Sequence, residues 1–203
     1  MTSDAMRRAM GPGVFTAGYL LPAVIAALVM GNGEFVFYII VMIVLIGLLG
    51  WVHMRVRFSA GLLWCMSVWG LMHMAGGLVP VPASWPIHGD VRVLYSWWLV
   101  VGHLKYDQVV HAFGFGVTTW LCWQALRAAW PNARPGFGVV SLCVLGAMGC
   151  GALNEVVEFV ATLTVPNTNV GGYINTGWDL VANTAGAITV GMVIYVWGRG
   201  GGA

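Results

Sequence analysis

Four short motifs place acidic, amide and imidazole side chains inside otherwise apolar stretches of this sequence. LMHMAGG contains His73, and YDQVVH contains Asp107 and His111. NEVVEF and NTGWDLVAN supply the remaining carboxylates and amides, which are Asn154, Glu155, Glu158, Asn175, Asp179 and Asn183. Within each of the last three motifs the polar residues lie three or four positions apart, which places them on one face of a helix.

The charge of these motifs constrains what the residues do. Charged side chains in hydrocarbon are costly, and those that occur there usually serve a function. No lysine or arginine lies within these apolar stretches to pair with the acids, which are Asp107, Glu155, Glu158 and Asp179. Four carboxylates that close together cannot all stay ionised. Either some of them are protonated, or bound cations neutralise them.

Two histidines with four carboxylates form the ligand set of di-iron and di-manganese helix bundles, and the same ligands suit zinc. We therefore predict a divalent metal site for iron, manganese or zinc, with the ligands His73, Asp107, His111, Glu155, Glu158 and Asp179. Side chains expected around these ligands or against a substrate are Tyr106, Asn154, Asn175 and Asn183. The match is one of ligand type, because di-iron bundles use Glu-x-x-His. The alternative is a set of hydrogen bonds between helices.

Composition shows what must hold these residues. Of 203 residues, 59% are hydrophobic and only 8% are charged, whereas soluble domains carry roughly 25% charged residues. Most of the surface must therefore face lipid. The net charge of +2 gives no indication of nucleic-acid binding. The four cysteines have no CxxC spacing, so no disulfide framework is expected.

The apolar runs predict an all-α, polytopic membrane bundle in one domain spanning residues 1–203. A transmembrane helix needs about 20 apolar residues, and six segments qualify: 14–30, 35–52, 59–78, 107–126, 139–163 and 178–197. Turn residues separate them, such as Gly31-Asn32-Gly33. Glycines inside the last three segments are expected to let helices approach closely.

The distribution of basic residues predicts the orientation of the bundle. Two basic residues, Arg92 and Lys105, lie on one side, and seven lie on the other: Arg7, Arg8, Arg55, Arg57, Arg127, Arg134 and Arg199. The positive-inside rule then places both termini in the cytoplasm. All four polar motifs fall in the outer half of the bilayer. The long outer loop contains an apolar segment, 91–104, for which we predict an interfacial helix, with a partial re-entrant segment as the alternative.

A family resemblance adds to this interpretation. The motifs HMAGG, YDQVVHAFGFG, NEVVEF and GYINTGWDLVANTAGA, in this order between Trp51 and Tyr195, resemble the YjdF-like family of bacterial inner-membrane proteins. The closing pattern of Asp179, Asn183 and Gly186 is distantly similar to VanZ-like membrane proteins. The YjdF-like resemblance implies a multi-pass protein of the bacterial inner (cytoplasmic) membrane, and it implies no reaction.

Three functions agree with the sequence. The first is a metal-dependent enzyme that acts on a lipid or another amphiphile, by oxygen chemistry with a redox-active metal or by attack on an ester or phosphoester with zinc or manganese. The second is a transporter that uses the carboxylates as a proton or cation relay; the inner halves of the helices lack ionisable residues, which argues against it. The third is a non-catalytic subunit of an oligomer or larger membrane complex.

Overall fold

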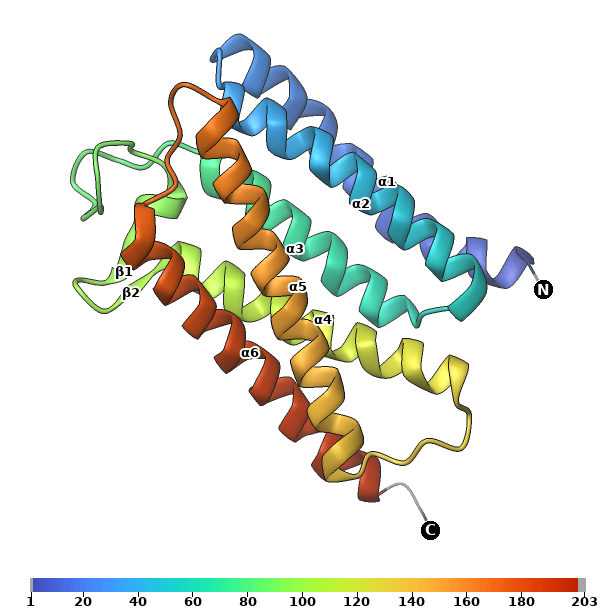
Figure 1. The fold of residues 1–203 in the computed structure, drawn as a ribbon. Helices are drawn as coiled ribbons and strands as arrows, with labels where there is room; N and C mark the ends of the chain where they lie inside the picture. Colours follow the sequence, from blue (N-terminus) through green and yellow to red (C-terminus); the bar gives the residue numbers. More distant parts are fainter. Residues whose placement is uncertain (1, 201–203) are drawn as a thin grey trace.

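A bundle of long helices makes up the described part of the chain (Figure 1). The computed structural model describes residues 2–200, and the side chains of residues 3–198. Its helices are α1 (Thr2–Val29), α2 (Gly33–Val56), α3 (Ala60–Leu78), α4 (Tyr106–Ala129), α5 (Phe137–Thr164) and α6 (Gly172–Gly200). All six predicted helices therefore exist, and an all-α fold is confirmed.

Local sequence explains several helix ends. The Asn32 side chain accepts a hydrogen bond from the Phe35 amide at 3.1 Å and caps α2. Ser59 caps α3 through the Leu62 amide at 3.3 Å. The turn between α1 and α2 contains Gly31, whose φ of 62° is readily adopted by glycine. These caps lie at the junctions predicted from the sequence.

Helix α1 begins twelve residues before its predicted start at residue 14. The early helix is stabilised by Asp4, which pairs with Arg7 at 2.9 Å and with Arg8 at 2.8 Å. Helix α2 also contacts this early part of α1, because His53 Nε2 lies 2.9 Å from the Ala5 carbonyl oxygen. The position of His53 at a junction between two predicted helices predicts a solvated or interfacial residue. This prediction was wrong, because His53 is only 2% exposed.

Five of these helices are long and apolar enough to cross a membrane: α1, α2, α3, α5 and α6. Helix α4 has 24 residues and the length to span, but it is not among these five. It packs against α3, α5 and α6, and much of its polar sequence faces these helices, as buried Gln108, His111 and Thr119 show. The least apolar helix is thus placed where it contacts protein on several sides.

The α4–α6 seam is unusually close, and glycine makes it so. A Cβ added at Gly186 would lie 1.8 Å from the Ala112 carbonyl oxygen, and one at Gly116 would lie 3.1 Å from the Gly186 carbonyl oxygen. On α5, a Cβ at Gly151 would lie 2.8 Å from Asn183 Nδ2, whereas Gly149 has nothing within 4 Å. The expectation that these glycines let helices approach closely is confirmed at Gly116, Gly151 and Gly186, and it was wrong at Gly149.

Residues 79–105 form a cap over one end of the bundle, at the left in Figure 1. The cap contains a short 3₁₀ turn (Leu94–Ser96) and two antiparallel strands, β1 (Trp98–Val100) and β2 (Leu104–Lys105). The prediction of a helix over 91–104 was therefore wrong. Backbone groups here pair across the loop, as the Trp98 amide does with the Pro86 carbonyl at 3.0 Å, and Gly102, with a φ of 75°, allows the chain to turn.

Candidate metal centre

The polar motifs of α4, α5 and α6 meet beneath the cap. Asp107 is the second residue of α4 and His111 follows one turn later. Glu155 and Glu158 lie near the end of α5, and Asp179 lies in the first half of α6. Because α4 and α6 start where α5 ends, their polar faces lie at the same depth of the bundle. Three helices that are distant in sequence thus contribute to one buried cluster.

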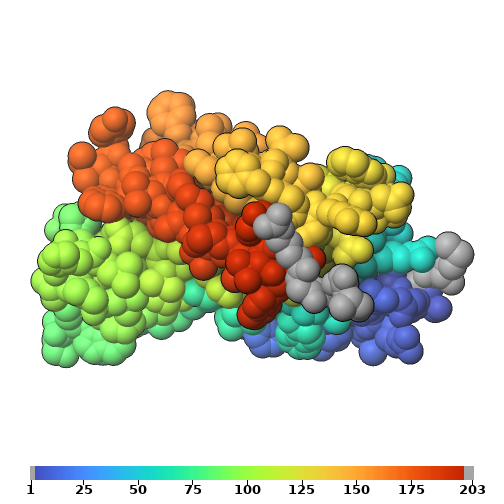
Figure 2. All heavy atoms as spheres, turned by 90° about the horizontal axis from the view of Figure 1, so that it is seen from below, coloured from blue at the N-terminus to red at the C-terminus, as the bar shows by residue number. Residues whose placement is uncertain are grey.

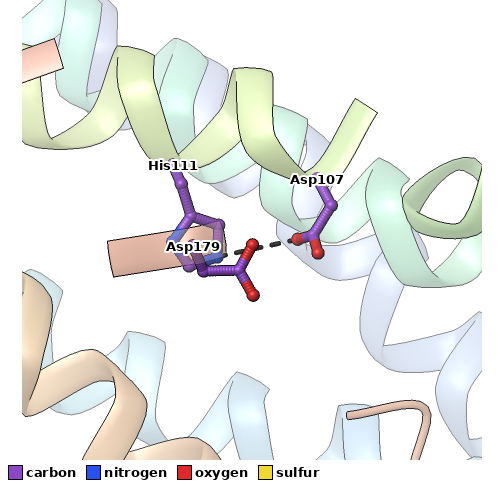
Figure 3. Close-up of side chains that lie close together, drawn as sticks. All are labelled: Asp107, His111 and Asp179. Carbon is purple, nitrogen blue, oxygen red and sulfur yellow. Dashed lines mark ion pairs between the residues drawn. The ribbon is translucent and has the colours of Figure 1, made fainter. Parts of the chain in front are cut away.

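Asp107, His111 and Asp179 form the first group of this cluster (Figure 3). Each offers one ligand atom, and these atoms all lie within 4.8 Å of one another. His111 Nε2 lies 3.6 Å from Asp107 Oδ1. Asp179 is fully buried, and the Asp107 side chain is 13% exposed. The carboxylates of α4 and α6 therefore face a common space beside the imidazole.

His111, Glu155 and Glu158 form the second group, which also lies within 4.8 Å. Glu158 Oε1 is 3.9 Å from His111 Nε2, and Glu155 Oε1 is 3.7 Å from His111 Nδ1. The two groups share His111, so five of the six predicted ligands surround one imidazole. These spacings exceed ordinary hydrogen bonds, and they leave space between the groups.

Several buried polar atoms of the cluster lack a hydrogen-bond partner among the described residues. They are both carboxylate oxygens of Glu155, Oδ1 of Asp179 and Nδ2 of Asn183. A buried polar atom without a partner costs about 1–3 kcal/mol, and more when it is charged. Native proteins therefore seldom leave such atoms together. A cation bound among these oxygens would satisfy them.

The amides around the cluster orient its carboxylates and its imidazole. Asn154 Nδ2 donates to Glu158 Oε1 at 2.9 Å, and Asn175 Nδ2 donates to Asp179 Oδ2 at 2.5 Å. Asn183 Oδ1 lies 3.0 Å from His111 Nδ1. By contrast, the Tyr106 hydroxyl donates to the Met72 carbonyl at 3.1 Å. The three predicted amides thus contact predicted ligands, and Tyr106 contacts α3 backbone.

Lys105 enters the cluster, which the sequence analysis missed. Its Nζ lies 3.3 Å from Asp107 Oδ2 and donates to Asn175 Oδ1. Its side chain is only 8% exposed. The apolar stretches themselves contain no lysine or arginine near the acids, but Lys105 is the residue just before α4. Its position two residues from Asp107 was the signal that could have revealed the pair.

His73 lies apart from the two groups. It shares a cavity of about 10 Å³ with His111 and Asn154, a space on the scale of one water molecule. His73 Nδ1 shares a hydrogen bond with the Tyr95 hydroxyl of the cap. The Tyr38 and Tyr95 rings each lie 5.7 Å from the imidazole. Burial raises the pKa of the Tyr95 phenol well above its usual value, and the Asp107 carboxylate acts in the same direction. The Tyr95 phenol is therefore neutral.

The position of His88 and His103 in the long loop predicts solvated or interfacial residues, and both are exposed. The cysteines Cys65, Cys122, Cys143 and Cys150 are all free thiols, which confirms the absence of a disulfide framework. The acidic and imidazole chemistry of the described residues is therefore concentrated beneath the cap.

Comparison with known proteins agrees with this architecture. No curated protein and no solved structure matches the chain significantly. A family of predicted membrane proteins, DUF2238, matches residues 13–200, which covers α1 from residue 13 onward, the other five helices, the cap and every residue of the cluster. Since that match spans most of the chain, this protein belongs to the DUF2238 family of predicted membrane proteins.

Proposed function

We propose that this membrane protein is a metal-dependent enzyme that acts on a lipid or another amphiphile. The site is the cluster beneath the cap, and its proposed ligands are Asp107, His111, Glu155, Glu158 and Asp179. The observation that carries the proposal is the group of unpartnered buried oxygens on Glu155 and Asp179 around the shared His111. The sixth predicted ligand, His73, is proposed as a positioning residue beside the same cavity.

The charge of the cluster supports a divalent ion. Lys105 compensates one of the four carboxylates through Asp107. The other carboxylates have no cationic lysine or arginine partner among the described residues. Like charges in one buried volume repel, and a divalent cation reverses this repulsion. Carboxylate oxygens with an imidazole nitrogen suit iron, manganese or zinc.

The orientation of His111 also supports a ligand role. Asn183 Oδ1 accepts from Nδ1, and the other ring nitrogen, Nε2, faces Asp107 and Glu158, where a metal ion would bind it. Metal-binding histidines usually donate their second ring N–H to an oxygen in this way. Asn183 therefore fixes the tautomer that a metal ligand needs.

The proposed reaction is hydrolysis of an ester or phosphoester bond at the end of the membrane where the cap lies. A divalent ion there would supply Lewis-acid stabilisation of charge on the ester or phosphoester oxygen. Glu155 acts as a ligand in this proposal, because both of its oxygens are free of hydrogen bonds from described residues. On the same helix Leu153 and Val156 are exposed apolar side chains, and we propose that the amphiphile approaches along this side of α5.

A transporter is the second candidate, favoured by the Lys105–Asp107 ion pair. A lysine and an acid 3.3 Å apart in a buried position form the kind of pair that proton-coupled proteins open and close. This function needs no metal. Metal analysis of the purified protein therefore separates the two candidates.

The deciding experiment is elemental analysis of the detergent-purified protein after dialysis against a buffer that contains trace divalent metal. We expect about one or two equivalents of iron, manganese or zinc per chain, and a loss of this metal in His111→Ala. His103→Ala is the matched control, because His103 is an exposed histidine of the cap. No bound metal in the wild-type protein, or equal metal in His111→Ala, would overturn the metal site.

The orientation of the bundle and its cellular location extend the proposal. We propose the bacterial inner membrane, in line with the YjdF-like resemblance, with both termini in the cytoplasm and the cap outside. The basic residues at the helix ends away from the cap, such as Arg57 and Arg127, support this orientation. A reporter fused to the C-terminus should be active in the cytoplasm, and periplasmic activity would reverse the orientation.

A further inference from the structure

A second cavity lies at the end of the bundle away from the cap. Its volume is about 490 Å³, within the usual size range of small-ligand pockets. It lies between the α2–α3 junction and the last turns of α4. Its lining includes Arg57, Ser59, Trp120, Trp123, Gln124 and Arg127. Figure 2 shows the cap (green) and the 130–140 segment (yellow) at opposite ends of the molecule. The cavity is therefore separate from the metal centre.

The cavity is cationic. Arg57 and Arg127 are both exposed, and no acidic residue lines the cavity. Neither guanidinium forms an ion pair within the described part of the chain, where the ion pairs of arginine and lysine join Arg7 and Arg8 to Asp4 and Lys105 to Asp107. The Arg127 guanidinium lies 5.8 Å from the centre of the Trp123 ring. Two cations without acidic partners at one opening favour an anionic ligand.

The walls of the cavity are fixed by contacts that do not involve the arginine side chains. Gln124 accepts from the Ser59 amide at 2.8 Å and donates to Ser59 Oγ at 2.9 Å, which joins α4 to the start of α3. The Arg57 amide donates to the His53 carbonyl at 2.7 Å, and its φ of 60° turns the chain sharply. The next residue, Phe58, is fully buried. The arginines are therefore held at the opening by a rigid junction.

We propose that this cavity, bounded by Arg57, Arg127 and Trp123, binds the phosphate group of an anionic membrane lipid. Its position at the helix ends favours a lipid over a free anion, since tryptophan and arginine gather at the membrane interface. The lining also includes apolar Val56, Ala128 and Pro131, which suits the glycerol and the first acyl carbons. Basic pockets between transmembrane helices bind lipid headgroups by this combination. The proposal is independent of the metal-site function.

The test uses the delipidated full-length protein in a neutral detergent. Phosphatidylglycerol should raise its Tm and bind more tightly than phosphatidylcholine, and inorganic phosphate at equal concentration should have no effect. In Arg57→Gln/Arg127→Gln we expect the apparent affinity for phosphatidylglycerol to fall on the order of thirtyfold. The matched control is Arg55→Gln/Arg134→Gln, which removes the same charge from two exposed arginines that do not line the cavity.

Three outcomes would overturn the proposal. One is equal binding of phosphatidylglycerol and phosphatidylcholine by the wild-type protein, a result that needs no variant to fold. Another is an equal loss of affinity in both double variants, which would mean a general charge effect. The third is an equal Tm shift with inorganic phosphate, which would mean a site for the free ion.

Discussion

His111 Nδ1 lies 3.0 Å from Asn183 Oδ1, and this contact joins α4 to α6 at the centre of the cluster. Both residues are nearly inaccessible, with Asn183 1% exposed. The contact depends on the close approach of the two helices where Gly186 faces Ala112. It aims the other imidazole nitrogen at the carboxylates of Asp107 and Glu158. Helix packing and the chemistry of the site are therefore linked through one hydrogen bond.

Asn183→Ala should weaken metal binding about 10–100-fold, because the imidazole loses the acceptor that fixes its tautomer. The measurement is metal titration of the metal-stripped protein, with its Tm recorded separately. Thr184→Ala is the control, since its hydroxyl donates an exposed hydrogen bond to the Leu180 carbonyl of its own helix. An unchanged metal Kd in Asn183→Ala would remove Asn183 from the site.

Lys105→Met should lower the Tm of the metal-free protein and tighten the binding of divalent metal. The substitution leaves Asp107 without its cation, and breaking a buried ion pair costs about 3–5 kcal/mol. The same excess negative charge attracts a metal ion more strongly. Arg92→Met is the control, because Arg92 is an exposed cap residue whose side chain donates to the Pro82 and Trp85 carbonyls, away from the cluster. Weaker metal binding in Lys105→Met would contradict this account.

Much of this architecture follows from sequence alone, because membrane spans require long apolar runs and helical spacing fixes which residues share a face. Asp107 and His111 could be paired on that basis, as could Glu155 and Glu158. What escaped prediction depends on contacts between distant segments. His53 becomes buried because it meets Ala5, 48 positions away, and Lys105 reaches the cluster because α6 brings Asn175 to it.

The cap was the least predictable element for a related reason. Its segment 91–104 is apolar, and apolar residues alone do not distinguish an interfacial helix from paired strands. The outcome depends on backbone partners such as Val79, whose carbonyl accepts from the Leu94 amide at 3.1 Å. Tyr95 was missed as a neighbour of His73 because only this fold of the cap brings the phenol to the imidazole.

Gly186→Ala should destabilise the bundle, and Gly149→Ala should not. A methyl group at Gly186 would collide with the Ala112 carbonyl of α4, whereas Gly149 has nothing within 4 Å. Overpacking costs about 1–3 kcal/mol, and more where backbone must move. The measurement is Tm in detergent, together with metal content. We expect Gly186→Ala to lose metal as well, because separating α4 from α6 separates His111 from Asn183. Equal Tm values for both variants would contradict the close seam.

Glu155→Gln/Glu158→Gln should lose most of the bound metal while the metal-free protein stays folded. Glutamine keeps the shape of each side chain and removes two negative charges from a site that has a surplus of them. The metal-free double variant should therefore unfold at the same temperature as metal-free wild type, or higher. Glu34→Gln is the control, because Glu34 is a buried acid elsewhere that accepts from the Asn169 amide at 2.8 Å. If metal content and Tm both stay at wild-type values in the double variant, these carboxylates do not form a shared metal site.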